Sequence, residues 1–512
     1  MEEVDATELK PNDADNDVEA TEELTPEEDK RLLRRIDLYL LPIMAASYMF
    51  QFLGTSAIGF TAILGLREDL RLTGTDFSWA NSTYYFGFLI AAYPASMIMV
   101  RWRVGKMIAV AVVLWGVVLM LTAVTTKAAD LLALRFFLGV CESPIAPGLT
   151  AIVAMWYKRS EQPLRHAAWF TGNTIAGIAG GLASYGIGHM DSIAPWKVEF
   201  AAVFFIFGGS TVAWSICLFF LLPDVPMTAW FMSKQDRRKA IQRVKENMTG
   251  IKSSQFKWKQ CREAALDAKT WFIVVIQLCG NIPSGGVHSF GVIIIHGLGF
   301  DTFPTLLLQT ASYVVSFALV LLATAGSTYL RNTRTYFMAW NFCVAIAGCV
   351  IIRQCSVEQK WARYAGFCLV FAYVANFPLL MSMASGNFGG FTKKMTVNAF
   401  VRAPYLAFTA DLWCARLTCF WTGQSFIAYC TGNIIGPQLF FAKEAPTYSS
   451  GLLAMLICFG IGLVSCMAFR FHLMWENRRR DQACDVSGRT EMENADLMDR
   501  TDKDISQFRY VY

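Results

Sequence analysis

The feature that most constrains this chain is a series of long apolar stretches that recur from residue 37 to residue 473. A helix needs about 20 apolar residues to cross a bilayer, and twelve stretches are close to that length. The chain is 54% hydrophobic and 17% charged, with a mean hydropathy of +0.38, whereas soluble chains average roughly 25% charged residues. An ordinary soluble enzyme is therefore excluded. The predicted spans are 37–60, 77–100, 106–124, 130–157, 167–189, 199–222, 271–297, 303–326, 335–352, 361–385, a broken span from 394 to 441, and 449–473.

Six predicted spans precede a hydrophilic segment at 223–270 and six follow it. Such a division is typical of transporters built from two duplicated halves. We therefore predict an all-α membrane protein with twelve transmembrane helices in two six-helix halves. The predicted parts are an acidic disordered tail at 1–35, the first half at 36–222, a basic linker at 223–270, the second half at 271–475 and a tail at 476–512.

Positive charge gathers in the connections on one side of the predicted spans, as it does in cytoplasmic loops. The segment 223–270 alone carries eleven basic and five acidic residues. The first 29 residues carry 13 acidic side chains, and no apolar stretch there is typical of a signal peptide. We expect both termini to be cytoplasmic and the location to be the plasma membrane, with an internal membrane as the alternative. The other basic connections contain Lys30, Arg31, Arg34, Arg35, Arg101, Arg103, Lys106, Lys158, Arg159, Arg165, Arg331, Arg334, Lys393, Lys394, Arg478, Arg479 and Arg480.

Signatures of enzyme chemistry are few. The 14 cysteines form no C-x-x-C pair and mostly lie in apolar runs, the five histidines are not grouped as metal ligands are, and no P-loop pattern occurs. The sequence thus predicts no enzyme, no metal site and no cofactor, and uphill transport would have to draw on an ion gradient. The expected partners are a small organic solute, protons and the lipid bilayer, without nucleic acid, and we expect a monomer.

Charged residues inside a span are costly, about 2.5–3.5 kcal/mol on insertion scales, and they mark functional candidates. The fourth span, LLALRFFLGVCESPIAPG, contains Arg135 and, seven residues later on the same helical face, Glu142. One interpretation is that both groups face a shared cavity. The other is that Arg135 braces a neighbouring helix and Glu142 forms a structural pair.

Uncharged polar residues supply further candidates for the lining of a transport path. Gln51, Tyr85 and Asn433 could form hydrogen bonds to a substrate. His288 and His296 lie eight residues apart in the seventh span, where either a proton relay or ordinary helix packing would account for them.

The fifth span, WFTGNTIAGIAGGLASYGIG, is rich in glycine, with Gly177 and Gly181 four residues apart. Small residues at this spacing predict close helix contact, as tight packing or as a surface on which two halves rock. Asn173 is the polar residue of this span best able to face a cavity. Separately, Asn81-Ser82-Thr83 is a candidate glycosylation site on the predicted outer side.

Several stretches together resemble a known family. They are IDLYLLPIMAASYMFQFLGTSAIGFTAILGLREDL, YYFGFLIAAYPASMIMVRWRVGK, LRFFLGVCESPIAPG, WYKRSEQPLRHAAWF and GNIIGPQLFFAKEAPTYSSG. From about residue 37 to residue 480 the chain is similar to the anion:cation symporter branch of the major facilitator superfamily, in particular to its fungal allantoate permease-like group. The resemblance implies a proton-linked carrier of small organic anions such as carboxylated vitamins, ureides or short peptides.

The resemblance also implies roles for particular residues. Arg135 and Gly139 match the R-x-x-x-G pattern of the fourth span, where the arginine influences proton coupling, and Glu142 matches the acid usual in this branch. Asn433 and Pro437 match the G-N-I-x-G-P pattern of the eleventh span.

A loop between the second and third spans carries Arg101, Gly105 and Lys106 and resembles a degenerate form of the family's gating motif. The chain departs from its relatives at Gly54 and Thr55, where an acid and a base are common, and at Ala92, where many have glutamate.

The eleventh span is interrupted by VRAPYLAFTADLWCARLTCFWTGQ, residues 401–424. Without these 24 residues, 396–400 and 425–441 would join into one span of 22 residues. We interpret 401–424 as a retained intron translated in frame. The alternative is a genuine insertion that disturbs the second half.

The sequence therefore predicts a secondary active transporter of small organic anions, working by alternating access as a proton-coupled symporter. The alternatives are a proton-driven exporter of a metabolite and a non-transporting nutrient sensor.

Overall fold

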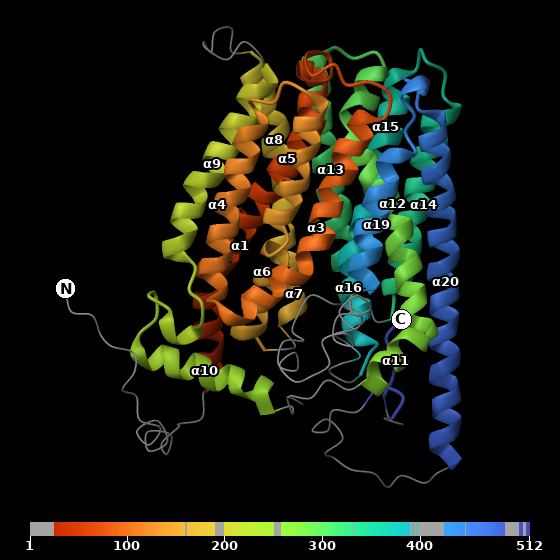
Figure 1. The fold of residues 1–512 in the computed structure, drawn as a ribbon. Coiled ribbons are helices and arrows are strands. Elements are labelled where there is room, and N and C mark those ends of the chain that lie inside the picture. Colours follow the sequence, from red (N-terminus) through yellow and green to blue (C-terminus); the bar gives the residue numbers. More distant parts are fainter. Residues whose placement is uncertain are drawn as a thin grey trace, which may run out of the picture.

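The computed structural model describes residues 25–158, 161–189, 199–249, 258–330, 332–389, 393, 397, 424–445, 447–486, 501–504 and 508–512. The regular secondary structure of these residues is helical. Two groups of long helices lie side by side, and two shorter helices lie at one end (Figure 1).

The first group contains the helices that precede residue 222. Its longest member, α1, ends in a π turn, η1, where Gly65 has a φ of 95° that glycine adopts readily. The group consists of α1 (Pro26–Thr61), η1 (Ala62–Leu66), α2 (Arg67–Asp69), α3 (Asp76–Arg101), α4 (Val104–Thr122), α5 (Ala128–Glu142), α6 (Ile145–Trp156), α7 (Gln162–Phe170), α8 (Gly172–Gly188) and α9 (Glu199–Leu221).

The second group follows residue 267. It consists of α12 (Ala268–Gly297), α13 (Thr302–Tyr329), α14 (Arg334–Gln354), α15 (Lys360–Val370), the 3₁₀ turn η3 (Phe371–Ala375), α16 (Asn376–Gly386), α19 (Gln424–Gln438) and α20 (Ser449–Val486). In the sequence, α10 (Lys234–Thr249) and α11 (Trp258–Leu266) come between the two groups. In space, these two helices lie at one end of the bundle (Figure 1). We call this the basic end, because the lysine- and arginine-rich connections meet there.

Within the described chain, nine helical segments are long and apolar enough to cross a membrane. They correspond to nine of the predicted spans, with α5 and α6 forming one of them and α15 to α16 another. Three further helices, α3, α8 and α19, lie at the positions of the other predicted spans. The all-helical fold is confirmed, and the total of twelve spans stays a prediction.

The fourth span is divided at Pro144. Proline lacks a backbone N–H and cannot continue the helical hydrogen bonding, so α5 ends at Glu142 and α6 begins at Ile145. The break therefore places the Glu142 carboxylate at a helix end in the middle of the bundle.

Two predicted boundaries were wrong. The first helix begins at Pro26, inside the tail predicted to be disordered to residue 35, because Thr25 and Glu28 form a reciprocal capping box at its start. The last helix runs to Val486, beyond the predicted 473, and Asn477 and Arg480 on this polar extension form hydrogen bonds to Tyr510 that stabilise it. The segment predicted as an insert lies, up to residue 423, outside the described residues.

Candidate functional site

The Glu142 carboxylate is the centre of a buried polar group in the first half. Only 3% of Glu142 is exposed. Gln51 Nε2 donates a hydrogen bond to Glu142 Oε1 at 2.6 Å, and Thr55 Oγ1 donates to Oε2 at 3.2 Å. The Tyr84 hydroxyl also interacts with this carboxylate. Neutral donors thus surround Glu142.

Gln51 and Thr55 lie one turn apart on α1, so both side chains point towards the end of α5. Thr55 Oγ1 also donates to the Gln51 carbonyl at 3.1 Å, and Gln51 Oε1 has no hydrogen-bond partner among the described residues. Sequence analysis proposed Gln51 and missed Thr55 as a site residue, and the four-residue spacing was the signal that could have found it.

Arg135 lies two turns before Glu142 on α5, about 10 Å along the helix axis. Only 2% of it is exposed, and its guanidinium carbon lies 5.8 Å from the centre of the Phe204 ring. Within the described residues, Arg135 Nε and Nη2 have no hydrogen-bond partner, and no salt bridge joins Arg135 to Glu142. Two buried guanidinium nitrogens without hydrogen-bond partners are costly, so this position is suited to an anion that arrives from outside the chain.

The R-x-x-x-G pattern also has a packing role. A Cβ atom on Gly139 would lie 2.0 Å from the Tyr84 carbonyl oxygen, and one on Gly87 would lie 2.1 Å from the Phe136 carbonyl oxygen. Glycines on α3 and α5 therefore allow these two helices to touch through their backbones. This close approach brings Tyr84 beside Glu142.

An aromatic group, which we call the aromatic bridge, connects the two halves next to this polar centre. It consists of Phe170 and Phe377, stacked at 4.9 Å, and of Tyr429 and Tyr85, whose ring centres lie 6.0 Å apart. Phe377 and Tyr429 are themselves 6.4 Å apart. Tyr85 was a sequence candidate, and the other three rings were not.

Asn433 belongs to a separate polar pair in the second half. Its Nδ2 donates to Asn281 Oδ1 at 3.3 Å and to the Tyr429 carbonyl at 2.9 Å. Asn433 is 1% exposed, and its Oδ1 has no hydrogen-bond partner among the described residues. The Tyr429 backbone thus connects this pair to the aromatic bridge.

The remaining candidates lie around these centres. Asn173 is half-buried in the first turn of α8 and interacts with Tyr48. The His288 ring packs edge-on against Phe52 at 5.2 Å. His296 is exposed, about 12 Å further along α12, so the two histidines do not form a direct relay.

The predicted gating loop is held by a residue that sequence analysis did not select. Asp224 Oδ1 accepts hydrogen bonds from the backbone N–H of Gly105 at 2.8 Å and of Lys106 at 3.4 Å. A carboxylate at this position satisfies free N–H groups at the start of α4 and favours its positive dipole end. The Arg101 side chain lies outside the described part of the structure.

Asn81, the glycosylation candidate, lies in the second turn of α3. It is 9% exposed, and its Nδ2 donates to the Phe77 carbonyl at 2.9 Å. Its glycosylation stays a prediction.

The two halves meet in the part of the bundle away from the basic end. A Cβ atom on Gly177 would lie 2.5 Å from the Tyr313 ring, and one on Gly181 would lie 2.0 Å from Thr310 Oγ1, so α8 and α13 are in close contact. On another pair of helices, α3 and α19, Ser82 Oγ donates to the Ile434 carbonyl at 2.8 Å. These glycines therefore pack between the halves rather than within one of them.

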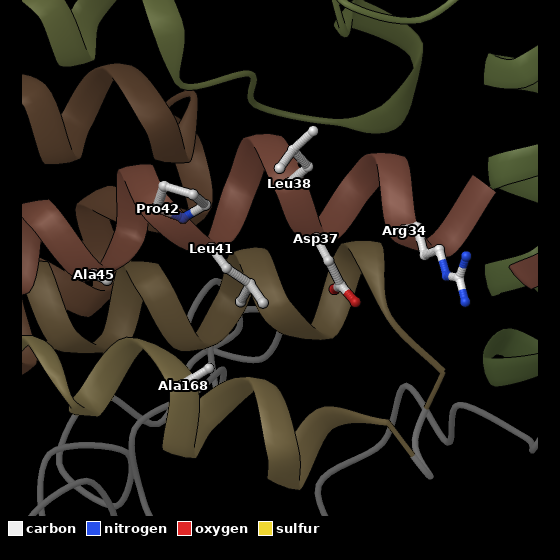
Figure 2. Close-up of a pocket in the computed structure, with 7 residues that line it drawn as sticks. All are labelled: Arg34, Asp37, Leu38, Leu41, Pro42, Ala45 and Ala168. Atoms are coloured by element: carbon white, nitrogen blue, oxygen red, sulfur yellow. The ribbon is translucent and has the colours of Figure 1, made fainter. Parts of the chain in front are cut away.

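Towards the basic end, an open groove runs along α1 beside α7. Arg34 and Asp37 lie at one end of this groove and Ala45 at the other, with Ala168 contributed by α7 (Figure 2). Its volume is about 450 Å³, and the remaining lining residues are Leu38, Leu41 and Pro42.

The groove follows one face of α1. Residues 34, 38, 41 and 45 are three or four positions apart, and the next positions on that face are Tyr48 and Phe52. The same helical face therefore leads from the basic end towards Phe52, whose ring packs against His288 of the second half. Within the described residues, no group of three or more His, Cys, Asp or Glu side chains could hold a metal ion.

Comparison with known proteins gives consistent matches. Residues 44–402 match the family described as the Major Facilitator Superfamily. An uncharacterised transporter of Schizosaccharomyces pombe is 32% identical over 491 residues, which cover 95% of this chain and 88% of the relative. The allantoate permease of Saccharomyces cerevisiae is 32% identical over 503 residues, which cover 96% of this chain and 88% of the permease. A solved bacterial homologue of the human lysosomal transporter Spinster, inward-facing and unoccupied, has a TM-score of 0.53 and 15% identity over 85% of this chain and 96% of that chain.

Proposed function

The chain belongs to the Major Facilitator Superfamily and is a multi-pass membrane transporter rather than an enzyme, and we propose that it carries small organic anions together with protons by alternating access. The observation that carries this proposal is the pair of buried charges on α5, which no salt bridge joins within the described residues. Arg135 has guanidinium N–H groups without partners, and Glu142 is held by neutral donors.

In this proposal, Arg135 attracts the anionic group of the substrate. A carboxylate at the guanidinium would supply the hydrogen bonds that the protein does not, and charge-assisted bonds of this kind are among the strongest. The aromatic bridge, which joins the two halves beside Glu142, and Asn433, which bonds the Tyr429 backbone within the second half, complete the substrate path.

Glu142 is the proposed proton carrier. A carboxylate without a cationic partner is favoured in the protonated form when the site closes and excludes water, and in the charged form when water enters. Gln51 and Thr55 remain bound to either form, because the carboxyl group accepts hydrogen bonds in both. Substrate and proton would thus bind two turns apart on one helix.

The basic end is proposed to be cytoplasmic, following the distribution of lysine and arginine. The conformation is then inward-facing, because α8 and α13 close the opposite end while the groove on α1 opens towards the basic end. Transport to the outward-facing state would separate α8 from α13 as one half rocks against the other. The plasma membrane is the proposed location.

Residues 401–424 are proposed to be absent from the transporting form. The family match ends at residue 402, and α19 begins at Gln424. These two limits are close to the ends of the segment that separates the two parts of the eleventh span.

Uptake of labelled organic anions by cells at external pH 5 and pH 7.5 tests the proposal. The chain as given is compared with a chain lacking residues 401–424, and each is tested with Arg135→Ala. Arg353→Ala is the matched control, because it removes the same charge at an exposed position. We expect acid-stimulated uptake by the chain lacking residues 401–424. Arg135→Ala should abolish this uptake and Arg353→Ala should leave it unchanged, with equal amounts of protein in the membrane.

Normal uptake by Arg135→Ala would remove this residue from the mechanism. Absence of uptake from both chain lengths, with protein present at the surface, would contradict anion import. Accumulation of substrate outside the cells would then indicate an exporter, and intact nutrient signalling without transport would indicate a sensor.

A further inference from the structure

The last part of the chain folds back onto the second half at the basic end. We call the described residues 501–504 and 508–512 the strap. Thr501, Asp502 and Tyr510 are buried, with exposed fractions of 2%, 0% and 3%. Figure 1 shows this end of the chain beside α11 and the first turns of α12. Such burial is unusual for an aspartate, which requires partners inside a protein.

Asp502 has a complete set of donors. Its Oδ1 accepts hydrogen bonds from Lys393 Nζ at 2.7 Å and from the Gly389 N–H at 3.0 Å. Its Oδ2 accepts from Lys269 Nζ and from the Tyr510 hydroxyl, the latter at 2.8 Å. The four donors come from α12 (Lys269), from the segment that follows α16 (Gly389 and Lys393) and from the strap itself (Tyr510).

The two lysines also have partners that balance their charge. Lys393 Nζ lies 2.8 Å from Asp267 Oδ2 and 2.9 Å from Glu263 Oε1. Asp502 contributes a third carboxylate to this buried network. Without it, two buried ammonium groups would share fewer anionic partners, and breaking a buried charge network in this way is strongly destabilising.

Two asparagines bind the strap backbone. Asn477 on α20 donates from Nδ2 to the Tyr510 carbonyl and accepts from the Tyr510 N–H, both at 2.9 Å. Asn387, which follows α16, binds the next residue, Val511, in the same two-sided way at 2.8 Å and 2.7 Å. Each amide thus satisfies both backbone groups of one residue, as a neighbouring β-strand would.

The Tyr510 ring adds a third kind of contact. Its centre lies 3.8 Å from Lys269 Nζ and 4.6 Å from the Arg480 guanidinium carbon, distances typical of cation–π interactions. Arg480 Nη2 also donates to the Tyr510 hydroxyl at 2.7 Å. The second half therefore binds three different parts of the strap at the basic end: the Asp502 carboxylate, the backbone of Tyr510 and Val511, and the Tyr510 ring.

We propose that the basic end of the second half contains a peptide-binding site for an acidic, tyrosine-containing segment, and that its occupant is the chain's own strap. The bound strap connects α12, α16 and α20, so that their ends move as one body. If one half rocks as a rigid body during transport, loss of the strap slows the conformational step without weakening substrate binding. This consequence for transport rests on the proposed function.

Binding of a fluorescent synthetic peptide with the sequence of residues 501–512 to full-length chains tests the site. The wild-type chain should not bind the peptide, because its own strap occupies the site, whereas an Asp502→Ala chain should bind it. Asp504→Ala is the matched control, since the bonds of Asp504 go to Thr501 within the strap, and this chain should behave as wild type. A peptide that itself carries Asp502→Ala should bind the Asp502→Ala chain at least about tenfold more weakly.

A second full-length variant, Asp502→Asn, keeps an acceptor for the Gly389 N–H and serves if Asp502→Ala does not fold. Hydrogen exchange in this variant should rise in α12, α16 and α20 near the basic end and stay unchanged in α1 to α9. Equal binding of the peptide to wild-type, Asp502→Ala and Asp504→Ala chains, or unchanged exchange in Asp502→Asn, would overturn the assignment of the site.

Uptake measurements then test the consequence. Asp502→Asn should lower the maximal rate about threefold or more with little change in KM, and Asp504→Ala should change neither. An unchanged maximal rate in Asp502→Asn would overturn the role in transport. Absence of transport both by the full-length chain and by a chain lacking residues 401–424 contradicts the proposed function instead, because peptide binding and hydrogen exchange do not depend on transport.

Discussion

Gln51 Nε2 lies 2.6 Å from Glu142 Oε1, and this bond joins the first predicted span to the residue at which the fourth span breaks. The donor is neutral, as is Thr55 on the next turn. Glu142 is therefore oriented without being neutralised by a cation in direct contact, which is the arrangement a titrating carboxylate requires.

Replacing Glu142 by Gln should remove the pH dependence of transport. Glutamine keeps the size and an acceptor oxygen but cannot release a proton, so the ratio of uptake at pH 5 to uptake at pH 7.5 should fall to about one while substrate exchange continues. Uptake assays with Glu358→Gln, an exposed position, provide the control. A Glu142→Gln variant that keeps full acid stimulation would exclude this residue as the proton carrier.

Replacing Gly181 by Ala should favour the state in which α8 and α13 are apart. The added Cβ would lie 2.0 Å from Thr310 Oγ1 and 3.2 Å from the Leu306 carbonyl oxygen, which is incompatible with the packed conformation. Accessibility to a membrane-impermeant reagent of a cysteine introduced at Tyr313, which lies in the same contact opposite Gly177, should increase in this background.

Gly186→Ala is the control on the same helix, because a Cβ there meets nothing within 4 Å. Similar labelling of Tyr313→Cys in the Gly181→Ala and Gly186→Ala backgrounds would contradict the prediction that Gly181→Ala separates α8 from α13.

Replacing Gly139 by Ala should destabilise the first half. The Cβ would lie 2.0 Å from the Tyr84 carbonyl oxygen, a backbone atom that cannot move away without displacing α3. Overpacking of this kind costs about 1–3 kcal/mol or more, so the midpoint of thermal unfolding in detergent should fall. Gly209→Ala on α9, where nothing lies within 4 Å of the added Cβ, should leave the midpoint unchanged. Equal midpoints for the two variants would argue against direct backbone contact between α3 and α5.

The strap should stay bound over the physiological pH range. Burial by itself raises the pKa of Asp502, but Lys269 and Lys393 outweigh it and hold this pKa well below its ordinary value. A carboxylate with a lowered pKa stabilises the folded state above its ordinary pKa of about 3.9 and loses that effect only as the pH falls below it. Burial and the neighbouring Asp502 carboxylate raise the pKa of Tyr510, so its hydroxyl stays protonated and keeps donating a hydrogen bond. We therefore predict that the peptide does not bind the wild-type chain between pH 5.5 and pH 8. Peptide binding that appears at pH 5.5 would contradict this charge balance.

The sequence by itself determined the class of fold, because span length and loop charge are local properties that decide how a chain inserts into a bilayer. It also indicated the family, through the resemblance of stretches such as LRFFLGVCESPIAPG. It also identified Arg135, Glu142 and Gln51 as separate candidates. Element ends were less predictable: α1 starts at a capping box formed by Thr25, and α20 continues beyond its apolar part.

Only the tertiary structure decided which residues meet. Gln51 and Glu142 are 91 positions apart, and Lys269 and Asp502 are 233 apart. Neither pair has a periodicity or spacing that marks it, because the contact depends on how helices cross and not on the residues between them. The close approach of α3 to α5 and of α8 to α13 depends equally on which helix faces each glycine, and that is a property of the packed bundle.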